Sequence, residues 1–362
     1  MTRLTIAIPT YNRPRQLTAT ISRLLPQLSS EVEIVVLDNH SPEPLEAVLA
    51  PLSQQFPNAR LQIIRHPANI GGNANILRCL EVGSGEWIWT LGDDDEPSAD
   101  AVKKILAGIT QHEQAVCINF ATSIKPRTET FTADSTSLLV GQLDSFSNLL
   151  FITANVYNRK RTHPYLQVAL AYLHSCAAQV VIFLAAVLDS QTVIFSQHYI
   201  ARNIPLPYGW PTYYSFYFYN IIECLPDIKS RRKIAILITD MVGPLNIWWC
   251  LRWAFASQVG NPKAPSALLF LARGSRLRAY YEPSVTARWR MYIISWGAER
   301  LLNNQPLALA AWKKLHQFKH KKTLEIPNLI DAYNGHFPQR KKLTSVSEHH
   351  QQTGTTANSA SN

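Results

Sequence analysis

The sequence predicts an α/β fold, in which a mostly parallel sheet carries helices on both faces and is followed by a helical C-terminal region. Over residues 1–120, short apolar runs alternate with stretches of helical periodicity. The runs are continuously apolar, which is typical of parallel strands that are covered on both faces. After residue 204 the pattern is helical. A chain of 362 residues, 46% of them hydrophobic, is long enough for two domains or for one domain with a large appendage.

The first part of the chain supplies the predicted sheet and its helices. Leucine and isoleucine at helical spacing predict a helix over residues 17–28, and Gly71-Gly72-Asn73 opens a second helix. Ser98 is the expected N-cap of a third helix. The predicted strands are residues 4–8, 33–37, 61–64, 86–91 and 115–120.

The later elements follow a different pattern. Residues 122–144 are rich in Thr and Ser and predict a surface excursion. Residues 166–188 predict one long helix, and residues 192–195 predict a short strand. Further helices are predicted at residues 228–241, 245–258, 267–273, 285–303 and 307–318.

The net charge is +10, and basic residues recur in the second half of the chain, from Lys229 to Lys322. Such a surface can meet phosphates, nucleic acid or an anionic membrane, and charge alone does not choose between them. The five cysteines are widely spread and form no C-x-x-C pair. This spacing argues against a zinc ribbon or a disulfide framework and favours free thiols in a reducing compartment.

No stretch predicts a secretion signal or a membrane span. Residues 1–8 lack the apolar core of a signal peptide, so we expect a cytoplasmic protein. Residues 166–188 and 234–256 are apolar, but polar or charged residues interrupt each of them. A membrane-spanning helix needs ~20 predominantly apolar residues. We therefore expect two buried or interfacial helices.

Three consecutive carboxylates, Asp93, Asp94 and Asp95, follow the strand predicted at residues 86–91. Like charges this close repel each other unless a cation or hydrogen bonds compensate them. The turn at Gly92 lets Asp93 and Asp95 point toward one site, where hard oxygen ligands suit Mg²⁺ or Mn²⁺ shared with substrate phosphates. The alternative is a solvated acidic turn that caps the next helix.

Polar residues gather at the carboxyl ends of the predicted strands. They form the segments 10–13, 38–39, 69–73 and 93–95. Since ligands of parallel α/β sheets bind beyond these strand ends, we expect the four segments to converge on one crevice. The alternative is that polar loops occur at both ends of the sheet without preference.

Three stretches in this order, IAIPTYNRP, VVLDNHS and NIGGNANILRCLEVGSGEWIWTLGDDD, resemble the family 2 glycosyltransferases of GT-A fold. The resemblance covers residues 3–120 and thins over residues 121–200. It implies an inverting transfer of a sugar from a nucleotide-diphosphate sugar to an acceptor hydroxyl, with Mg²⁺ or Mn²⁺ as cofactor. The implied domains are a GT-A domain at 1–204, with a nucleotide half at 1–120 and an acceptor half at 121–204, a helical region at 205–338, and a polar tail at 339–362 whose composition predicts disorder.

The resemblance also implies roles for single residues. Asp38 would hydrogen-bond the nucleobase, and Asn73 lies in the segment that closes over the nucleotide. Asp93 would face the ribose or the metal, and Asp95 would bind the metal, whose charge stabilises the departing diphosphate. The other residues of the implied donor site are Pro9, Thr10 and Tyr11, which would line the base and ribose, and Asp94 and Arg13. The alternative for Arg13 is a surface charge where a helix begins.

The chain departs from the family pattern at the catalytic base. Family members carry a later carboxylate that deprotonates the acceptor, but the equivalent region here, AYLHSCAAQVVIFL, contains no acid. His174 is the candidate base in this region, and an unperturbed histidine pKa of ~6.5 suits the task. The alternatives are a histidine buried in an apolar helix, and Asp189 as the base at the far end of that helix.

Aromatic residues in the second half, among them Trp210, Trp248 and Trp253, are interspersed with arginines. This composition suits sugar stacking or a membrane interface, and the alternative is a helical core with long basic side chains at its surface. We expect a saccharide or lipid-linked saccharide acceptor in surface polysaccharide assembly, peripheral contact with an anionic membrane at its inner face, and no nucleic acid partner.

Two other function classes remain to be compared. The missing acid leaves open a nucleotide-sugar-binding scaffold that has lost transfer activity. A dinucleotide-dependent oxidoreductase is disfavoured, because Pro9-Thr10-Tyr11 follows the first strand where a G-x-G-x-x-G motif would stand.

Overall fold

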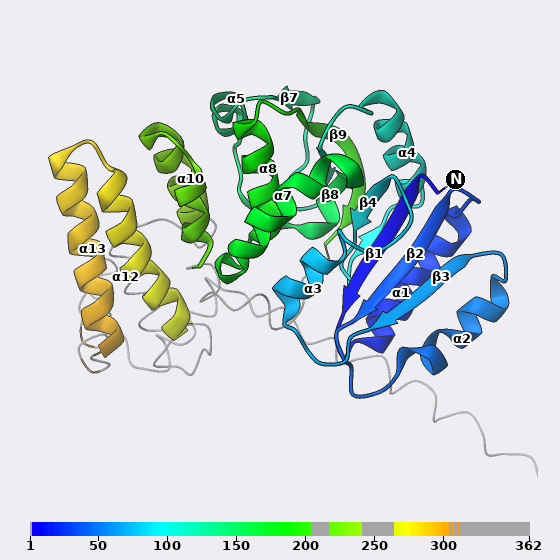
Figure 1. Cartoon of the computed structure of the whole chain (residues 1–362). Coiled ribbons are helices and arrows are strands. Elements are labelled where there is room, and N and C mark those ends of the chain that lie inside the picture. The colour runs from blue at the N-terminus through cyan, green and yellow to red at the C-terminus, as the bar shows by residue number, and fades with distance from the viewer. Residues whose placement is uncertain (1, 204–216, 241–263, 304–305, 307–309, 311–362) are drawn as a thin grey trace, which may run out of the picture.

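A computed structural model of the chain describes residues 2–203, 217–240, 264–303, 306 and 310 (Figure 1). The helix predicted at 245–258, nearly all of the one predicted at 307–318, and the tail at 339–362 lie outside these residues. Within the described residues the predicted α/β fold is confirmed. Nine strands form one sheet with helices on both faces, and helices α10, α12 and α13 follow it.

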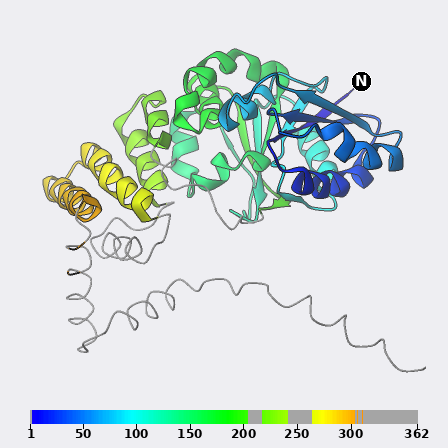
Figure 2. The ribbon, with the colours of Figure 1, turned by 90° about the horizontal axis from the view of Figure 1, so that it is seen from below.

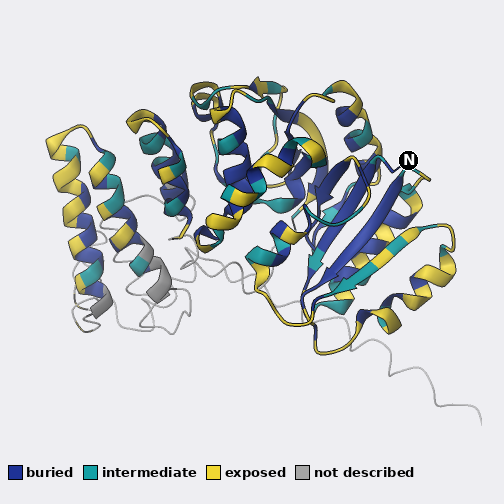
Figure 3. Ribbon diagram, in the orientation of Figure 1, coloured by how far each residue is buried: buried dark blue, intermediate teal, exposed yellow. Residues whose placement is uncertain are grey.

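The first half of the sheet is parallel, as predicted. Its strands, in spatial order, are β3 (Arg60–Arg65), β2 (Val32–Asp38), β1 (Leu4–Thr10) and β4 (Trp87–Thr90). Figure 3 shows β1 and β2 buried along their length, which explains why their sequences are continuously apolar. Thr10 pairs with Asp38 in the register of β1 and β2, so these two strands end side by side.

The second half of the sheet is mixed. Strand β8 (Asn155–Asn158) runs antiparallel to both β4 and β6 (Cys117–Thr122), whereas β9 (Val193–Arg202) runs parallel to β6. The short strands β5 (Glu96–Pro97) and β7 (Phe131–Ala133) each pair antiparallel with β9. Because β8 reverses the strand direction, the residues that precede it lie beside the carboxyl end of β4.

Two helical layers cover the sheet (Figures 1 and 2). In β1, Ile6 and Ile8 belong to the core on one face and Ala7 to the core on the other, because successive side chains of a strand point to opposite faces. One layer consists of α1 (Pro14–Leu24), α2 (Leu45–Gln55) and α4 (Ala101–Gln111), and the other of α3 (Gly72–Arg78), α7 (Arg159–Ala171) and α8 (Ala178–Leu188).

The C-terminal helices begin with η4 (Phe218–Cys224) and α10 (Ile228–Asp240), whose apolar residues join the core of the α3, α7 and α8 layer. Helices α12 (Ala264–Tyr281) and α13 (Val285–Asn303) follow. The helices predicted at 228–241 and 285–303 are confirmed, and the one predicted at 267–273 is longer than expected. Among the described helices, none has both the length and the apolar content that crossing a bilayer requires.

Two predictions of local structure are wrong. The N-cap of α4 is Asp100, and Ser98 instead donates a hydrogen bond to the Asp100 carboxylate (2.9 Å). Residues 122–144 are more than a surface excursion, since β7 and α5 (Thr136–Gln142) bury Ala133 and Leu139 in the core. Helix α2 has no counterpart among the predicted elements.

The long helix predicted at residues 166–188 is also wrong. Helix α7 ends at Ala171, a 3-10 turn, η3 (Leu173–Ser175), follows, and α8 begins at Ala178. The chain reverses at Cys176, which has a left-handed φ of 55°. The apolar pattern alone does not disclose this break, because no Gly or Pro marks it.

A buried amide network fixes the segment that leads into β8. Asn119 Nδ2 donates to the Asn148 carbonyl (3.1 Å) and to Asn155 Oδ1 (2.5 Å). Asn148 Nδ2 donates back to Asn119 Oδ1 (2.7 Å), and Thr122 Oγ1 donates to Asn148 Oδ1 (2.7 Å). These bonds join β6 to residues 148–155.

We expect Asn119→Ala to lower the free energy of unfolding by ~3 kcal/mol or more, because Asn148 and Asn155 would stay buried without their partners. Chemical denaturation followed by circular dichroism checks this. Asn58→Ala, at an exposed position, is the control and should stay within ~0.5 kcal/mol of the parent protein. Equal stability of the two variants would contradict a structural role for the network.

Candidate active site

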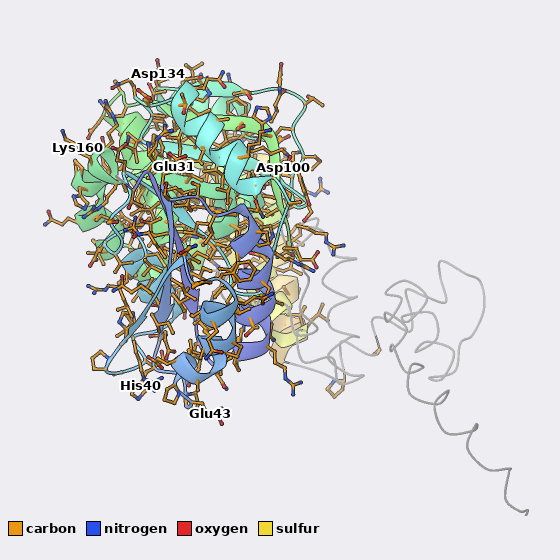
Figure 4. The ribbon with its side chains drawn as sticks, turned by 90° about the vertical axis from the view of Figure 1, so that its right-hand side faces the viewer. Glu31, His40, Glu43, Asp100, Asp134 and Lys160 are labelled. Carbon is orange, nitrogen blue, oxygen red and sulfur yellow. The ribbon has the colours of Figure 1, made fainter. Side chains whose placement is uncertain are left out.

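The candidate site lies at the carboxyl ends of the parallel strands, along the lower edge of the sheet in Figure 1. Figure 4 gives a side view, in which His40 and Glu43, just after β2, lie at this lower edge and Glu31, just before β2, lies near the opposite one. Figure 2 views the molecule from below, from the side of this edge.

Hydrogen bonds link the four polar segments that follow β1, β2, β3 and β4. Thr10 Oγ1 donates to Asp93 Oδ2 (2.6 Å), and the Asn39 backbone N–H donates to the Thr10 carbonyl (2.9 Å). Asn39 Nδ2 in turn donates to Asn69 Oδ1 (2.9 Å). The structure therefore gathers these segments at one edge, and the alternative of polar loops without preference for either end is unnecessary here.

Arg13 neutralises two members of the acidic triplet. Its NH1 group donates to Asp93 Oδ1 (3.1 Å) and to Asp94 Oδ2 (3.0 Å). Thr20 of α1 fixes the backbone of the same turn, because its hydroxyl donates to the carbonyls of Asp93 and Asp95 (3.0 Å each). The first helix thus holds the triplet in place, and Arg13 is more than a surface charge where that helix begins.

Asp95 depends on residues that the sequence does not single out. Thr153, just before β8, donates to Asp95 Oδ2 and accepts a hydrogen bond from the Gly92 backbone N–H (2.9 Å). Asn203, just after β9, donates to Asp95 Oδ1 (3.3 Å). Gly92 is needed because a Cβ at this position would overlap Asp95 Oδ2.

Burial raises the pKa of Asp93 to about 6 and that of Asp95 to about 7, from an ordinary 3.8. Hydrogen bonds from Thr10 to Asp93 and from Thr153 to Asp95 oppose these shifts, whereas the charge of Asp94 adds to both. The two buried carboxylates therefore lack part of the compensation that their charges require. A divalent cation is a group that would supply it.

The donor set fits Mg²⁺ or Mn²⁺, since both ions prefer carboxylate oxygens. The described residues contain no group of three His, Cys, Asp or Glu side chains arranged to hold a metal ion. An ion between Asp93 and Asp95 would thus take its remaining ligands from water or from substrate phosphates, as Mg²⁺ commonly does.

Asp38 is fully buried at the end of β2. Its Oδ2 accepts a hydrogen bond from Arg65 NH1 (2.6 Å), and its Oδ1 accepts one from the Ser41 backbone N–H (2.8 Å). One oxygen therefore holds the loop after β2 and the other holds Arg65 at the end of β3, and contact with a nucleobase would require one of them to be shared. Tyr11, after β1, is 45% exposed and presents its ring to solvent.

Comparison with known proteins identifies the family. The sequence model of the family described as Glycosyl transferase family 2 matches residues 5–179. The match identifies residues 5–179 as a member of this family. The resemblance seen in the sequence is thereby confirmed.

Curated relatives match about a third of this chain. It is 31% identical over 117 residues to an uncharacterized glycosyltransferase of Haemophilus influenzae, covering 32% of this chain and 37% of the relative. It is 26% identical over 101 residues to abequosyltransferase RfbV of Salmonella typhimurium, covering 27% and 30%. A third relative, 27% identical over 106 residues and covering 29% and 34%, is named GalNAc(5)-diNAcBac-PP-undecaprenol beta-1,3-glucosyltransferase of Campylobacter jejuni. The matches thus span about a third of each relative's length.

Solved structures share the fold of this family 2 protein. S. aureus TarS residues 1–349 in complex with UDP is 15% identical with a TM-score of 0.55, covering 86% of this chain and 92% of that one. Mannosyltransferase PcManGT from Pyrobaculum calidifontis, in complex with GDP-Man and Mn²⁺, is 13% identical with a TM-score of 0.50, covering 83% and 87%. At these identities the likeness establishes the fold alone, and that fold is the expected GT-A fold.

The region in which we expect the catalytic base contains the break between α7 and α8. His174 lies in η3, is exposed, and stacks on the Tyr172 ring with 5.9 Å between centroids, so the alternative of a buried helical histidine is wrong. Burial raises the pKa of the Cys176 thiol, and the side chain of Asn73, at the start of α3, opposes this shift. Asp189 lies at the opposite end of α8.

We expect Asp95→Asn to stabilise the protein, and to do so more at pH 8 than at pH 5. The unfolded chain ionises Asp95 above its ordinary pKa of 3.8, whereas the folded protein retains the proton up to about pH 7. The carboxyl group therefore favours folding at low pH and loses that contribution as the pH rises through 7. Asparagine does not ionise, so the gain at pH 8 is on the order of 2–4 kcal/mol.

Thermal and chemical unfolding at both pH values measure this effect. The control is Asp100→Asn, at an exposed carboxylate whose pKa is lowered by hydrogen bonds from Lys104 and Ser98, and which should therefore lose a little stability at pH 8. An Asp95→Asn variant that is less stable than the parent at pH 8 would contradict the assigned burial penalty.

Proposed function

We propose that this chain is an inverting glycosyltransferase that moves a sugar from a nucleotide-diphosphate sugar to an acceptor hydroxyl. The observation that carries the proposal is the acidic triplet at 93–95, with Asp93 and Asp95 buried, at the edge where four strand ends of a family 2 fold meet. Two structural neighbours support a nucleotide donor, since TarS is in complex with UDP and PcManGT with GDP-Man and Mn²⁺.

The triplet is proposed to hold the cation. Asp95 and Asp93 would bind Mg²⁺ or Mn²⁺, which supplies Lewis-acid stabilisation of the departing diphosphate when bound. Arg13 contacts Asp93 and Asp94 while 38% of its side chain is exposed, so it places a second positive charge beside the expected diphosphate. Thr153 keeps the Asp95 carboxylate in position through its hydroxyl.

The nucleoside is proposed to lie over the ends of β1 and β2, in the nucleotide half at residues 1–120. Pro9, Thr10 and Tyr11 would line the base and ribose, and the exposed ring of Tyr11 is available for stacking on the base. Asp38 would accept a hydrogen bond from the base with an oxygen shared with Arg65 or Ser41. Asn73 would close over the nucleotide from the start of α3.

His174 is proposed as the general base. It lies on an exposed turn between α7 and α8, which both pack against α3, and the acceptor half at residues 121–204 supplies this turn. An inverting transfer needs a base on the side of the sugar opposite the leaving diphosphate. The imidazole would take the proton of the acceptor hydroxyl as that oxygen attacks the sugar.

The acceptor is proposed to be a saccharide or a lipid-linked saccharide in surface polysaccharide assembly. Two relatives support this class by their names, one an abequosyltransferase and the other a glucosyltransferase for a PP-undecaprenol-linked saccharide. A lipid-linked acceptor would bring the protein to the inner face of the membrane, as a peripheral protein.

The second candidate is a nucleotide-sugar-binding scaffold without transfer activity. The absence of any acid between Ala171 and Leu184 favours it, because the residue that other family members use as base is missing. Product formation separates the two candidates, since a scaffold would bind nucleotide and metal but release no diphosphate.

We expect Asp95→Ala to abolish sugar transfer and donor hydrolysis with a panel of nucleotide sugars, measured as release of nucleoside diphosphate. Loss of a metal ligand removes the charge that stabilises the leaving group. Asp134→Ala, at an exposed carboxylate far from the edge that carries the site (Figure 4), is the control and should retain full activity. Undiminished turnover by Asp95→Ala would contradict the proposed function.

We expect His174→Gln to reduce kcat by about 10²–10⁴-fold while leaving nucleotide affinity unchanged, because a general base acts on the acceptor alone. Asp189→Asn is the comparison, at the other candidate base. If Asp189→Asn loses activity and His174→Gln keeps it, the role of general base belongs to Asp189.

A further inference from the structure

Helix α13 is apolar on two opposite sides. One side packs against α12 and buries Met291, Ile294, Ala298 and Leu301. The other side faces solvent at the end of the molecule farthest from α2, where Figure 3 shows α13 largely exposed. The exposed apolar residues on this side, which we term the α13 stripe, are Val285, Trp289, Tyr292, Ile293 and Trp296.

The α13 stripe is unusually apolar for a surface. Trp289 is 65% exposed, and Trp296 and Ile293 are each 60% exposed. At 3.6 residues per turn the five side chains fall within an arc of about 100°, so they form one continuous strip along the helix. Soluble proteins seldom expose contiguous apolar strips unless another surface covers them.

Most charges on the helices that carry and support the α13 stripe are positive. Residues 264–303 contain six arginines and two glutamates, and no acidic residue occurs from 283 to 298. Both glutamates are already paired, Glu282 with Arg232 and Arg278, and Glu299 with Arg276. The arginines nearest the stripe in the helical repeat are Arg288, Arg290 and Arg300.

The exposed apolar strip and the arginines around it together favour one kind of partner. A second copy of this face would bring arginines against arginines, which disfavours a symmetric dimer through the stripe. An anionic lipid surface accepts both features, because Trp and Tyr rings lie at headgroup level and arginines meet the lipid phosphates. The Arg300 guanidinium already lies over the Trp296 ring, 5.5 Å from its centroid, so charge and ring reach the same surface together.

We propose that the α13 stripe binds the surface of an anionic membrane, with the helix lying in the plane of the headgroups. The proposal deepens the proposed function, because a lipid-linked acceptor lies in such a membrane. The candidate active site lies in the sheet and not in α12 or α13, so binding through the stripe leaves the strand ends uncovered by it (Figure 1).

The test is co-sedimentation of the full chain with vesicles, measured without nucleotide sugar or acceptor so that it stands apart from transfer activity. Vesicles of phosphatidylcholine alone are compared with vesicles of phosphatidylcholine and phosphatidylglycerol, at low and high salt. The parent protein should bind only the anionic vesicles, and more weakly at high salt. Brominated acyl chains in these vesicles should quench its tryptophan fluorescence.

Two variants with matched controls locate the contact. Trp289→Ser with Trp296→Ser should weaken binding by ~10-fold or more. Its control, which should bind as the parent does, is Leu138→Ser with Leu188→Ser, at exposed apolar residues elsewhere.

The double variant Arg288→Gln with Arg300→Gln should bind the vesicles more weakly, and its binding should depend less on the salt concentration. This variant still tests the proposal if the tryptophan variant does not fold. Its control, Lys103→Gln with Lys160→Gln, removes the same charge from exposed positions outside α13 and should bind as the parent does.

Three results would overturn the proposal. The first is that the parent protein does not bind anionic vesicles at low salt. The second is that a folded variant of the stripe binds as well as the parent does. The third is a dimer in light scattering that the tryptophan variant converts to a monomer, which would assign the stripe to a second copy of the chain. Retained transfer to a water-soluble acceptor in the stripe variants would show that the proposed function stands independently.

Discussion

The main constraint on this structure is the electrostatic free energy that it costs to place three consecutive carboxylates at the end of a buried strand. Asp93 and Asp95 are almost fully buried, and their charges are compensated only in part by Thr10, Arg13 and Thr153. Burial of a charge without full compensation destabilises a folded protein, so a site of this kind is expected where function requires it. A divalent cation would complete the compensation, and its remaining ligand positions are free for the oxygens of a diphosphate.

This constraint explains why the sheet changes direction after β4. The parallel half alone brings Thr10 and Arg13 to the triplet, because β1 and β4 are neighbours. Asp95 needs a donor from the other side, and the reversal at β8 places Thr153 there, with Trp89 Nε1 donating to the Thr153 carbonyl (2.8 Å). The amide network of Asn119 then holds that segment. The core packing of the mixed half is thus coupled to the geometry of the site.

Much of this arrangement is readable from the sequence, and the remainder has identifiable reasons. Continuous apolar runs with polar residues after them predict β1, β2, β3 and β4 and the segments that meet at their ends. Thr153 and Asn203 are not predicted, because they reach Asp95 only through the places that β8 and β9 take in the sheet. No local sequence pattern encodes these places. The break at Cys176 escapes prediction because a residue other than Gly adopts the left-handed conformation there.

The central claim is that the acidic triplet forms a joint site for a divalent cation and a nucleoside diphosphate. The most direct measurement is the melting temperature of the protein with UDP, GDP, TDP or CDP, each with and without Mn²⁺, since a ligand that binds only the folded state stabilises it by ~2.7 kcal/mol at 100 times its Kd. The account predicts that at least one nucleotide raises the melting temperature strongly with Mn²⁺ and weakly without it. If no nucleotide raises it in the presence of Mn²⁺, or if Mn²⁺ makes no difference, the claim is contradicted.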